Sequence, residues 1–224
     1  MKLLDKNIKL FIFDLDGTLI DSTSLWHDID LKFFEMHNQE LPANYSEEIA
    51  HLGLYGTAKY TKEKYGLSES IEEILKIWND MALKAYQEEI PLKPYALELL
   101  TLLKEHNVHI ALATANSEDL YLPCIERLGI KLYFDYIIDV TKCRSGKNSS
   151  EIYEKTAKYF LLDKEETVVL EDILQSMITA YEAGFNVIGV YDKNSVKDKE
   201  TNKKYCQLYI DDFYSLIKLI KENN

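Results

Sequence analysis

Short apolar runs alternate with helical patterns along most of the chain. The apolar runs are rich in valine, isoleucine and leucine and have the length of strands: 8–13, 108–113, 136–140, 167–170, 186–190 and 208–210. Helical patterns fall between them: 95–105, 117–128, 150–160 and 173–183. Near-continuous apolar runs are typical of strands buried on both faces of a parallel sheet. The alternation predicts a doubly wound α/β fold that binds ligands at the carboxyl ends of its strands.

One long segment interrupts this alternation. Residues 22–90 contain no convincing strand, only helical patterns such as 25–36 and 71–87, and Pro91 and Pro94 follow the segment. A helical insert of this length is far longer than an ordinary connection between a strand and a helix. We therefore expect an α/β core of residues 1–21 and 91–224, with residues 22–90 inserted as an all-helical cap.

The charge of the chain restricts the kinds of partner. The net charge is −12, and Arg127 and Arg144 are its only arginines. Nucleic-acid binding requires a positive surface that displaces counterions, so we do not expect a nucleic-acid partner. An acidic protein that handles phosphate must gather positive charge locally, through a metal ion and a few lysines.

Targeting and redox signals are missing from the sequence. No uninterrupted apolar run of about 18 residues occurs, and charged residues break up the apolar residues near the start. Cys124, Cys143 and Cys206 are widely spaced and form no CxxC pair, which argues against a zinc site and a disulfide framework. We expect a cytoplasmic protein without membrane partners, either a monomer or a weak dimer.

Polar residues stand where the predicted strands end. Asp14 follows the first strand, Thr114 the second, and Glu171 and Asp172 the fourth. If these strands are parallel neighbours, their side chains converge on one edge of the sheet. Carboxylates gathered there, Asp16 included, repel one another, and Mg²⁺ is their natural counter-charge because it prefers oxygen ligands.

Two further features at the same edge suit an anion. Thr114 supplies a hydroxyl next to the backbone N–H groups that open the following helix. Lys147 lies in a loop that opens another helix and supplies a positive charge. Carboxylates, a metal ion, a hydroxyl, helix N–H donors and one lysine together favour phosphoryl transfer.

The order of these motifs resembles that of the haloacid dehalogenase-like (HAD) superfamily. DLDGTL at 14–19 resembles its signature, and LATANS with Thr114, SGKNSSEIY with Lys147 and VVLEDILQSM with Glu171 and Asp172 follow in the family's order. The resemblance covers essentially the whole chain, including the helical insert. The chain is most similar to the β-phosphoglucomutase-like subgroup of capped small-molecule phosphatases and mutases.

The resemblance implies a role for each motif. Asp14 would be the nucleophile that forms an aspartyl-phosphate, Asp16 the general acid and base, and Lys147 a catalytic cation that neutralises the approach of two anions. The implied phosphate-binding residues are Thr114, the N–H groups of Ala115 and Asn116, and Lys147. The implied Mg²⁺ ligands are the carboxylate of Asp14, the carbonyl of Asp16, and Asp172, with Glu171 either a ligand or a partner of one.

Three positions depart from the family's pattern. Ile173 and Ser176 stand where the family usually has serine and glycine, and Asn148 stands where it usually has proline. None of these changes removes a charge that the implied chemistry needs. They concern the packing of the metal-binding loop and therefore the affinity for the metal.

The sequence favours hydrolysis of a phosphate monoester on a small metabolite, such as a sugar phosphate. A sugar phosphomutase is the alternative, but it must grip a second phosphate, and residues 22–90 contain no arginine for that purpose. A non-catalytic phosphate-binding or regulatory protein is the alternative of another class. Its expected marker, loss of Asp14 or Asp16, is absent.

Overall fold

The computed structural model describes residues 1–49, 52–144, 149–193 and 199–224. These residues fall into two units: Met1–Thr23 with Ile90–Asn224, and Ser24–Glu89. The chain leaves the first unit after its first long strand and returns to it at Ile90. Each unit has its own core.

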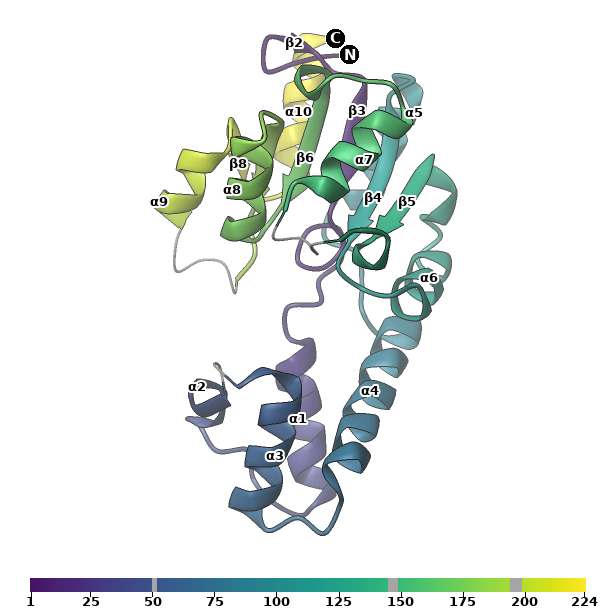
Figure 1. Ribbon diagram of the computed structural model, residues 1–224. Coiled ribbons are helices and arrows are strands. Elements are labelled where there is room, and N and C mark those ends of the chain that lie inside the picture. The colour runs from purple at the N-terminus through teal and green to yellow at the C-terminus, as the bar shows by residue number, and fades with distance from the viewer. Residues whose placement is uncertain (50–51, 145–148, 194–198) are drawn as a thin grey trace. The chain divides into compact units, whose positions relative to one another are not determined.

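Six parallel strands form the main sheet of the larger unit (Figure 1). In spatial order they are β5 (Tyr136–Asp139), β4 (His109–Thr114), β3 (Leu10–Phe13), β6 (Thr167–Glu171), β7 (Asn186–Val190) and β8 (Leu208–Ile210). The chain first builds outward from β3 to β4 and β5, and then crosses to the other side for β6. The prediction of a doubly wound parallel sheet is confirmed, and the strand order reverses beside β3, where such folds bind ligands.

Helices cover both faces of this sheet (Figure 1). On one face, Leu10 and Ile12 of β3 join a buried cluster with α7 (Glu151–Tyr159) and α8 (Leu174–Glu182). On the other face, α5 (Ala96–Glu105) packs against α10 (Phe213–Asn223). The helix α6 (Glu118–Arg127) follows β4. Because alternate residues of β3 point to opposite faces, all four of its side chains are buried.

Several elements are too short to show hydrophobic periodicity and were not predicted from the sequence. They are β1 (Lys2–Leu3), β2 (Lys6–Asn7), α9 (Lys199–Asn202) and the 3₁₀ turns η1 (Lys131–Tyr133), η2 (Val140–Lys142), η4 (Lys164–Glu166) and η6 (Lys203–Tyr205). The longer helix α10 was also not predicted. β1 and β2 pair as an antiparallel hairpin, and the N–H of Lys2 donates to Oδ1 of Asn224 at 2.7 Å, which joins the two ends of the chain.

Helices are the only regular elements among the described residues of the smaller unit. It consists of α1 (Leu25–Met36), α2 (Tyr45–Ile49), α3 (Gly53–Tyr65) and α4 (Ile71–Glu88). Phe33 of α1 packs edge-on against Trp78 of α4, with ring centroids 5.4 Å apart. A capping box of Ser70 and Glu73 fixes the start of α4. In the parts of the chain that the structure describes, no helix has the length and apolar character needed to cross a membrane.

A partly buried ion pair joins α1 to the loop before α4. Nδ1 of His37 lies 2.8 Å from the carbonyl oxygen of Phe33, and Nε2 lies 2.9 Å from Oε1 of Glu69. Both neighbours are acceptors, so both ring nitrogens donate, which requires a protonated imidazole. Burial lowers the pKa of His37, but the hydrogen bonds with Phe33 and Glu69 outweigh it and raise the pKa above its ordinary value.

We expect this ion pair to stabilise the fold more at low pH than at high pH. A raised folded-state pKa gives stabilisation that is complete below about pH 6.5 and is lost as the pH rises through the folded-state pKa. His37→Gln should therefore lower the free energy of unfolding by about 1.5–3 kcal/mol at pH 6, and by clearly less at pH 8.5. Urea denaturation at both pH values measures this difference, with Glu69→Gln as a second route to the same loss. Equal destabilisation by His37→Gln at both pH values would contradict the assignment.

Candidate active site

The register of the sheet places Asp14 beside Glu171. Phe13 of β3 aligns with Leu170 of β6, and Asp14 and Glu171 are the next residues along each strand. The N–H of Asp14 donates to the carbonyl oxygen of Leu170 at 3.0 Å, which extends the pairing by one residue. Asp14 and Glu171 are both buried. Two carboxylates that are 157 positions apart in the sequence thus meet at the carboxyl ends of adjacent strands.

Asp172 completes a group of three buried carboxylates. Asp14, Glu171 and Asp172 each offer an oxygen within 4.8 Å of the others. Burial raises the pKa of Asp172 well above its ordinary value, and the charges of Asp14, Glu171 and Asp192 raise it further. Lys93 acts in the opposite direction. Burying like charges this close together raises the free energy of the folded protein, and a bound cation offsets that repulsion.

The donor set fits Mg²⁺. All three residues present carboxylate oxygens, the ligand type that hard divalent cations prefer, and none offers sulfur or nitrogen. The structure brings together three residues of the predicted metal set: Asp14, Glu171 and Asp172. Asp16, predicted to contribute its backbone carbonyl, directs its carboxylate elsewhere, as described below.

The turn after β3 depends on a glycine that touches Asp172. Gly17 has φ +72°, and a Cβ added there would lie 2.4 Å from Oδ2 of Asp172. The neighbouring Thr18 is fully buried, and its hydroxyl donates to Oδ1 of Asp172 at 3.2 Å. Thr18 lies within the DLDGTL motif, but the sequence alone indicated no role for it. The turn therefore supplies both the space for the Asp172 carboxylate and one of its hydrogen bonds.

Asp16 meets the loop that follows β4. Nδ2 of Asn116 donates to Oδ2 of Asp16 at 2.6 Å. The N–H of Asn116 donates to the hydroxyl oxygen of Thr114 at 3.1 Å, and Thr114 is fully buried while Ala115 is exposed. The predicted acid–base residue and the predicted phosphate-binding loop are thus joined directly. This contact gives Asn116 an orienting role that its sequence position did not indicate.

Lys147 lies outside the described residues. A different cation, Lys93, lies near the carboxylates, and its charge partly offsets the rise in the pKa of Asp172. Nζ of Lys93 donates to Oδ2 of Asp192 at 3.1 Å and to the carbonyl oxygen of Tyr191 at 2.8 Å. The hydroxyl of Thr23 donates to the same Asp192 oxygen at 2.7 Å. Lys93 follows no predicted strand and belongs to no motif. Its proximity to the carboxylates is evident only from the folded structure, in which its charge acts on Asp172.

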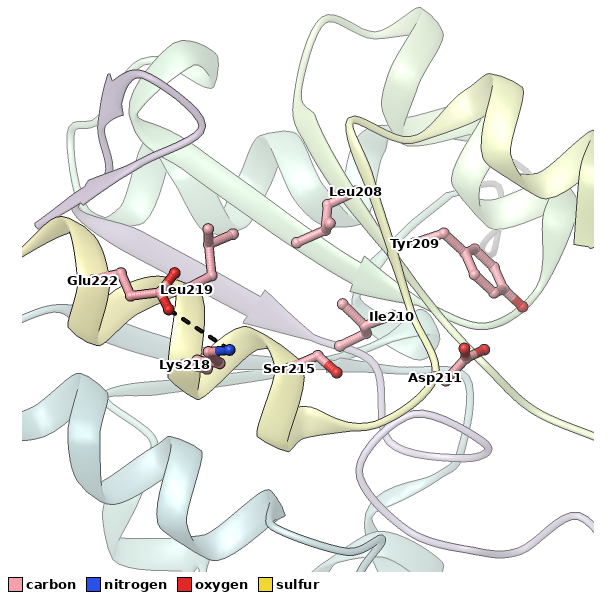
Figure 2. Close-up of a pocket in the computed structure, with 8 residues that line it drawn as sticks. All are labelled: Leu208, Tyr209, Ile210, Asp211, Ser215, Lys218, Leu219 and Glu222. Carbon is pink, nitrogen blue, oxygen red and sulfur yellow. Dashed lines mark ion pairs between the residues drawn. The ribbon is translucent and has the colours of Figure 1, made fainter.

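A separate hollow of about 310 Å³ lies between β8 and α10 (Figure 2). Its walls include Leu208, Ile210 and Leu219, and an ion pair from Nζ of Lys218 to Oε1 of Glu222 spans 3.8 Å at one side. None of the residues predicted for the site lines it. It also contains no member of the carboxylate group, so it is not the candidate active site.

The family of the chain follows from comparison with known proteins. Residues 11–190 match the family described as haloacid dehalogenase-like hydrolase. A phosphorylated carbohydrates phosphatase of Thermotoga maritima is 25% identical over 182 residues, which cover 79% of this chain and 82% of the relative. Hexitol phosphatase B of Escherichia coli (strain K12) is 25% identical over 191 residues, which cover 83% and 84%.

Solved structures agree with this assignment at the level of the fold. A Thermotoga maritima protein provisionally named as a β-phosphoglucomutase superposes with a TM-score of 0.84 at 21% identity, covering 96% of this chain and 99% of that one. The match confirms the β-phosphoglucomutase-like architecture. The family match spans the strands that carry Asp14, Thr114 and Glu171, and the named relatives are phosphatases. The chain thus belongs to the haloacid dehalogenase-like hydrolase family.

Proposed function

We propose that this protein hydrolyses a phosphate monoester of a small metabolite, a sugar phosphate or a similar compound, with Mg²⁺ and through an aspartyl-phosphate on Asp14. The observation that carries the proposal is the meeting of Asp14 with Glu171 and Asp172 at the ends of β3 and β6. Asp16 lies two residues further along the same turn, next to the loop of Thr114 and Asn116.

In the first half of the proposed reaction, Asp14 attacks phosphorus. A bond forms between a carboxylate oxygen of Asp14 and phosphorus while the bond from phosphorus to the alcohol oxygen breaks. Asp16 donates its proton to that oxygen as it leaves. The hydrogen bond from Asn116 holds the Asp16 carboxyl group in one orientation for this transfer. Thr114 and the N–H groups of Ala115 and Asn116 bind the phosphoryl oxygens.

In the second half, water attacks the phosphorus of the aspartyl-phosphate. Asp16, now a carboxylate, accepts the proton of that water. The bond between phosphorus and the Asp14 oxygen breaks, inorganic phosphate leaves, and both aspartates return to their starting states. Splitting one difficult displacement into two easier ones is the advantage of covalent catalysis.

The metal would be held by Asp14, Glu171 and Asp172, with the carbonyl of Asp16 as a further proposed ligand. When bound, Mg²⁺ supplies the positive charge that offsets the repulsion between the anionic nucleophile and the anionic phosphate. Thr18 and Gly17 keep the Asp172 carboxylate in place for this role. Lys147 is proposed to add a second positive charge.

Hydrolysis accounts for the chain better than phosphate transfer between sugar hydroxyls does. A mutase must hold a second phosphate group while the bisphosphate intermediate reorients in the site. The segment Ser24–Glu89 contains no arginine that would bind that phosphate. A small phosphorylated carbohydrate or sugar alcohol is the proposed substrate class because relatives are named for such compounds.

Asp14→Asn should abolish turnover. The amide is a far weaker nucleophile than the carboxylate, so we expect phosphate release to fall by about 10⁴-fold or more. Phosphate release from a panel of sugar phosphates, sugar-alcohol phosphates, pyrophosphate and p-nitrophenyl phosphate, with Mg²⁺ and with chelator, measures this effect.

The matched control is Asp135→Asn. This carboxylate lies just before β5, where its Oδ2 accepts the N–H of Ile110 at the opposite end of the sheet from Asp14. It should retain turnover with a modest loss of stability. Release by Asp14→Asn at a wild-type rate, or wild-type release that chelator leaves unchanged, would contradict the proposal.

Gly17→Ala should weaken Mg²⁺ binding and activity together. A methyl group at Gly17 overlaps the Asp172 carboxylate, which must then move, and we expect the Mg²⁺ dissociation constant to rise about ten-fold or more. Gly129→Ala is the matched control because Gly129 has φ +70° with no atom within 4 Å of the added Cβ. It carries the same backbone strain, about 1–2 kcal/mol, without the overlap. Equal Mg²⁺ affinity in the two variants, by titration calorimetry, would rule out the proposed contact.

A further inference from the structure

Tyr153 lies in the core directly beneath the carboxylate group. It is the third residue of α7, its side chain is 1% exposed, and it belongs to the buried cluster between the sheet, α7 and α8. Its ring packs edge-on against Phe185, with centroids 6.1 Å apart. A phenylalanine would fill this space equally well, so packing alone does not explain the hydroxyl group.

The hydroxyl of Tyr153 donates a hydrogen bond to Oε1 of Glu171 at 2.6 Å. The bond is fully buried and joins α7 to the end of β6. Burial raises the pKa of Tyr153 well above its ordinary value, and the charges of Glu171 and Asp14 raise it further. The hydroxyl therefore keeps its proton and acts as a donor to the carboxylate.

We infer that Tyr153 is a positioning residue for the metal centre, which it serves by fixing the orientation of the Glu171 carboxylate through this hydrogen bond. The inference rests on the proposed Mg²⁺-dependent function and gives a role to the last residue of the SGKNSSEIY motif, to which the resemblance assigned none. A glutamate side chain has three rotatable bonds. A short hydrogen bond from a rigid aromatic side chain to its carboxylate restricts rotation about all three. Residues that orient metal ligands in this way commonly change metal affinity by about 10–100-fold when they are removed.

The position of the donor explains why a tyrosine is suitable. Tyr153 is held by its ring in the apolar cluster, so its hydroxyl approaches Glu171 from the side of the core. Glu171 and Asp172 are adjacent in the chain, while Asp14 comes from the neighbouring strand. The hydrogen bond from Tyr153 therefore fixes the orientation of the Glu171 carboxylate without adding another charge to the group of three carboxylates.

Tyr153→Phe tests the inference because it removes the hydroxyl and keeps the ring. Titration calorimetry with MgCl₂ on the substrate-free protein should give a dissociation constant about 10–100-fold above that of the wild type. Circular dichroism and thermal unfolding establish that the variant is folded. The same substitution in a Glu171→Gln background should change the Mg²⁺ dissociation constant by less than about two-fold, because its effect acts through the carboxylate.

Tyr45→Phe is the matched control. It also removes a buried hydroxyl that makes one hydrogen bond, to Oγ1 of Thr61 at 2.7 Å, but in the helical unit. It should leave Mg²⁺ binding unchanged. Wild-type protein that binds no Mg²⁺ would overturn the proposed metal site and this inference with it. If the wild-type protein binds Mg²⁺ and the Tyr153→Phe variant binds it with the same dissociation constant, only the role of Tyr153 is overturned.

Discussion

The repulsion among three buried carboxylates is the constraint on which the site depends. Asp14, Glu171 and Asp172 are buried at the carboxyl ends of two strands, and each offers an oxygen within 4.8 Å of the others. Without a compensating charge such a group destabilises the folded protein, as the raised pKa of Asp172 indicates. With a divalent cation the same geometry becomes a binding site. The register of β3 and β6 places Asp14 beside Glu171, and Asp172 follows directly in the chain.

The surrounding structure can be understood as support for these carboxylates. The turn of Gly17 and Thr18 holds the Asp172 carboxylate, and Tyr153 of α7 holds that of Glu171. The backbone of Asp14 is fixed by its N–H, which donates to the carbonyl oxygen of Leu170. The Lys93–Asp192 pair lies near enough for both charges to affect Asp172. A site assembled from elements this far apart in sequence forms only when the whole sheet is in register, so folding and function are closely linked here.

The sequence predicted the elements that repeat a clear pattern. The buried strands were predicted correctly because both faces of a parallel sheet demand apolar residues. The location of the site was predicted from the polar residues that follow or end those runs at Asp14, Thr114 and Glu171, and the structure brings Asp14 and Glu171 together. The hairpin of β1 and β2 was missed because two-residue strands have no periodicity. Lys93, Tyr153 and the Asn116–Asp16 contact were missed because each depends on side-chain packing between distant segments, which residue spacing does not encode.

The central claim is that Asp14 accepts the phosphoryl group, and trapping that intermediate tests it most directly. Asp16→Asn protein would be mixed with p-nitrophenyl phosphate and Mg²⁺, quenched in acid and digested for mass spectrometry. The p-nitrophenolate leaves without needing a proton, whereas the second step lacks its base, so the intermediate should accumulate. The account predicts a burst of one p-nitrophenolate per protein molecule and one phosphoryl group on the peptide that contains Asp14. Two results would contradict it. One is an Asp16→Asn variant that turns over at the wild-type rate with no burst, and the other is a phosphoryl group on any other residue.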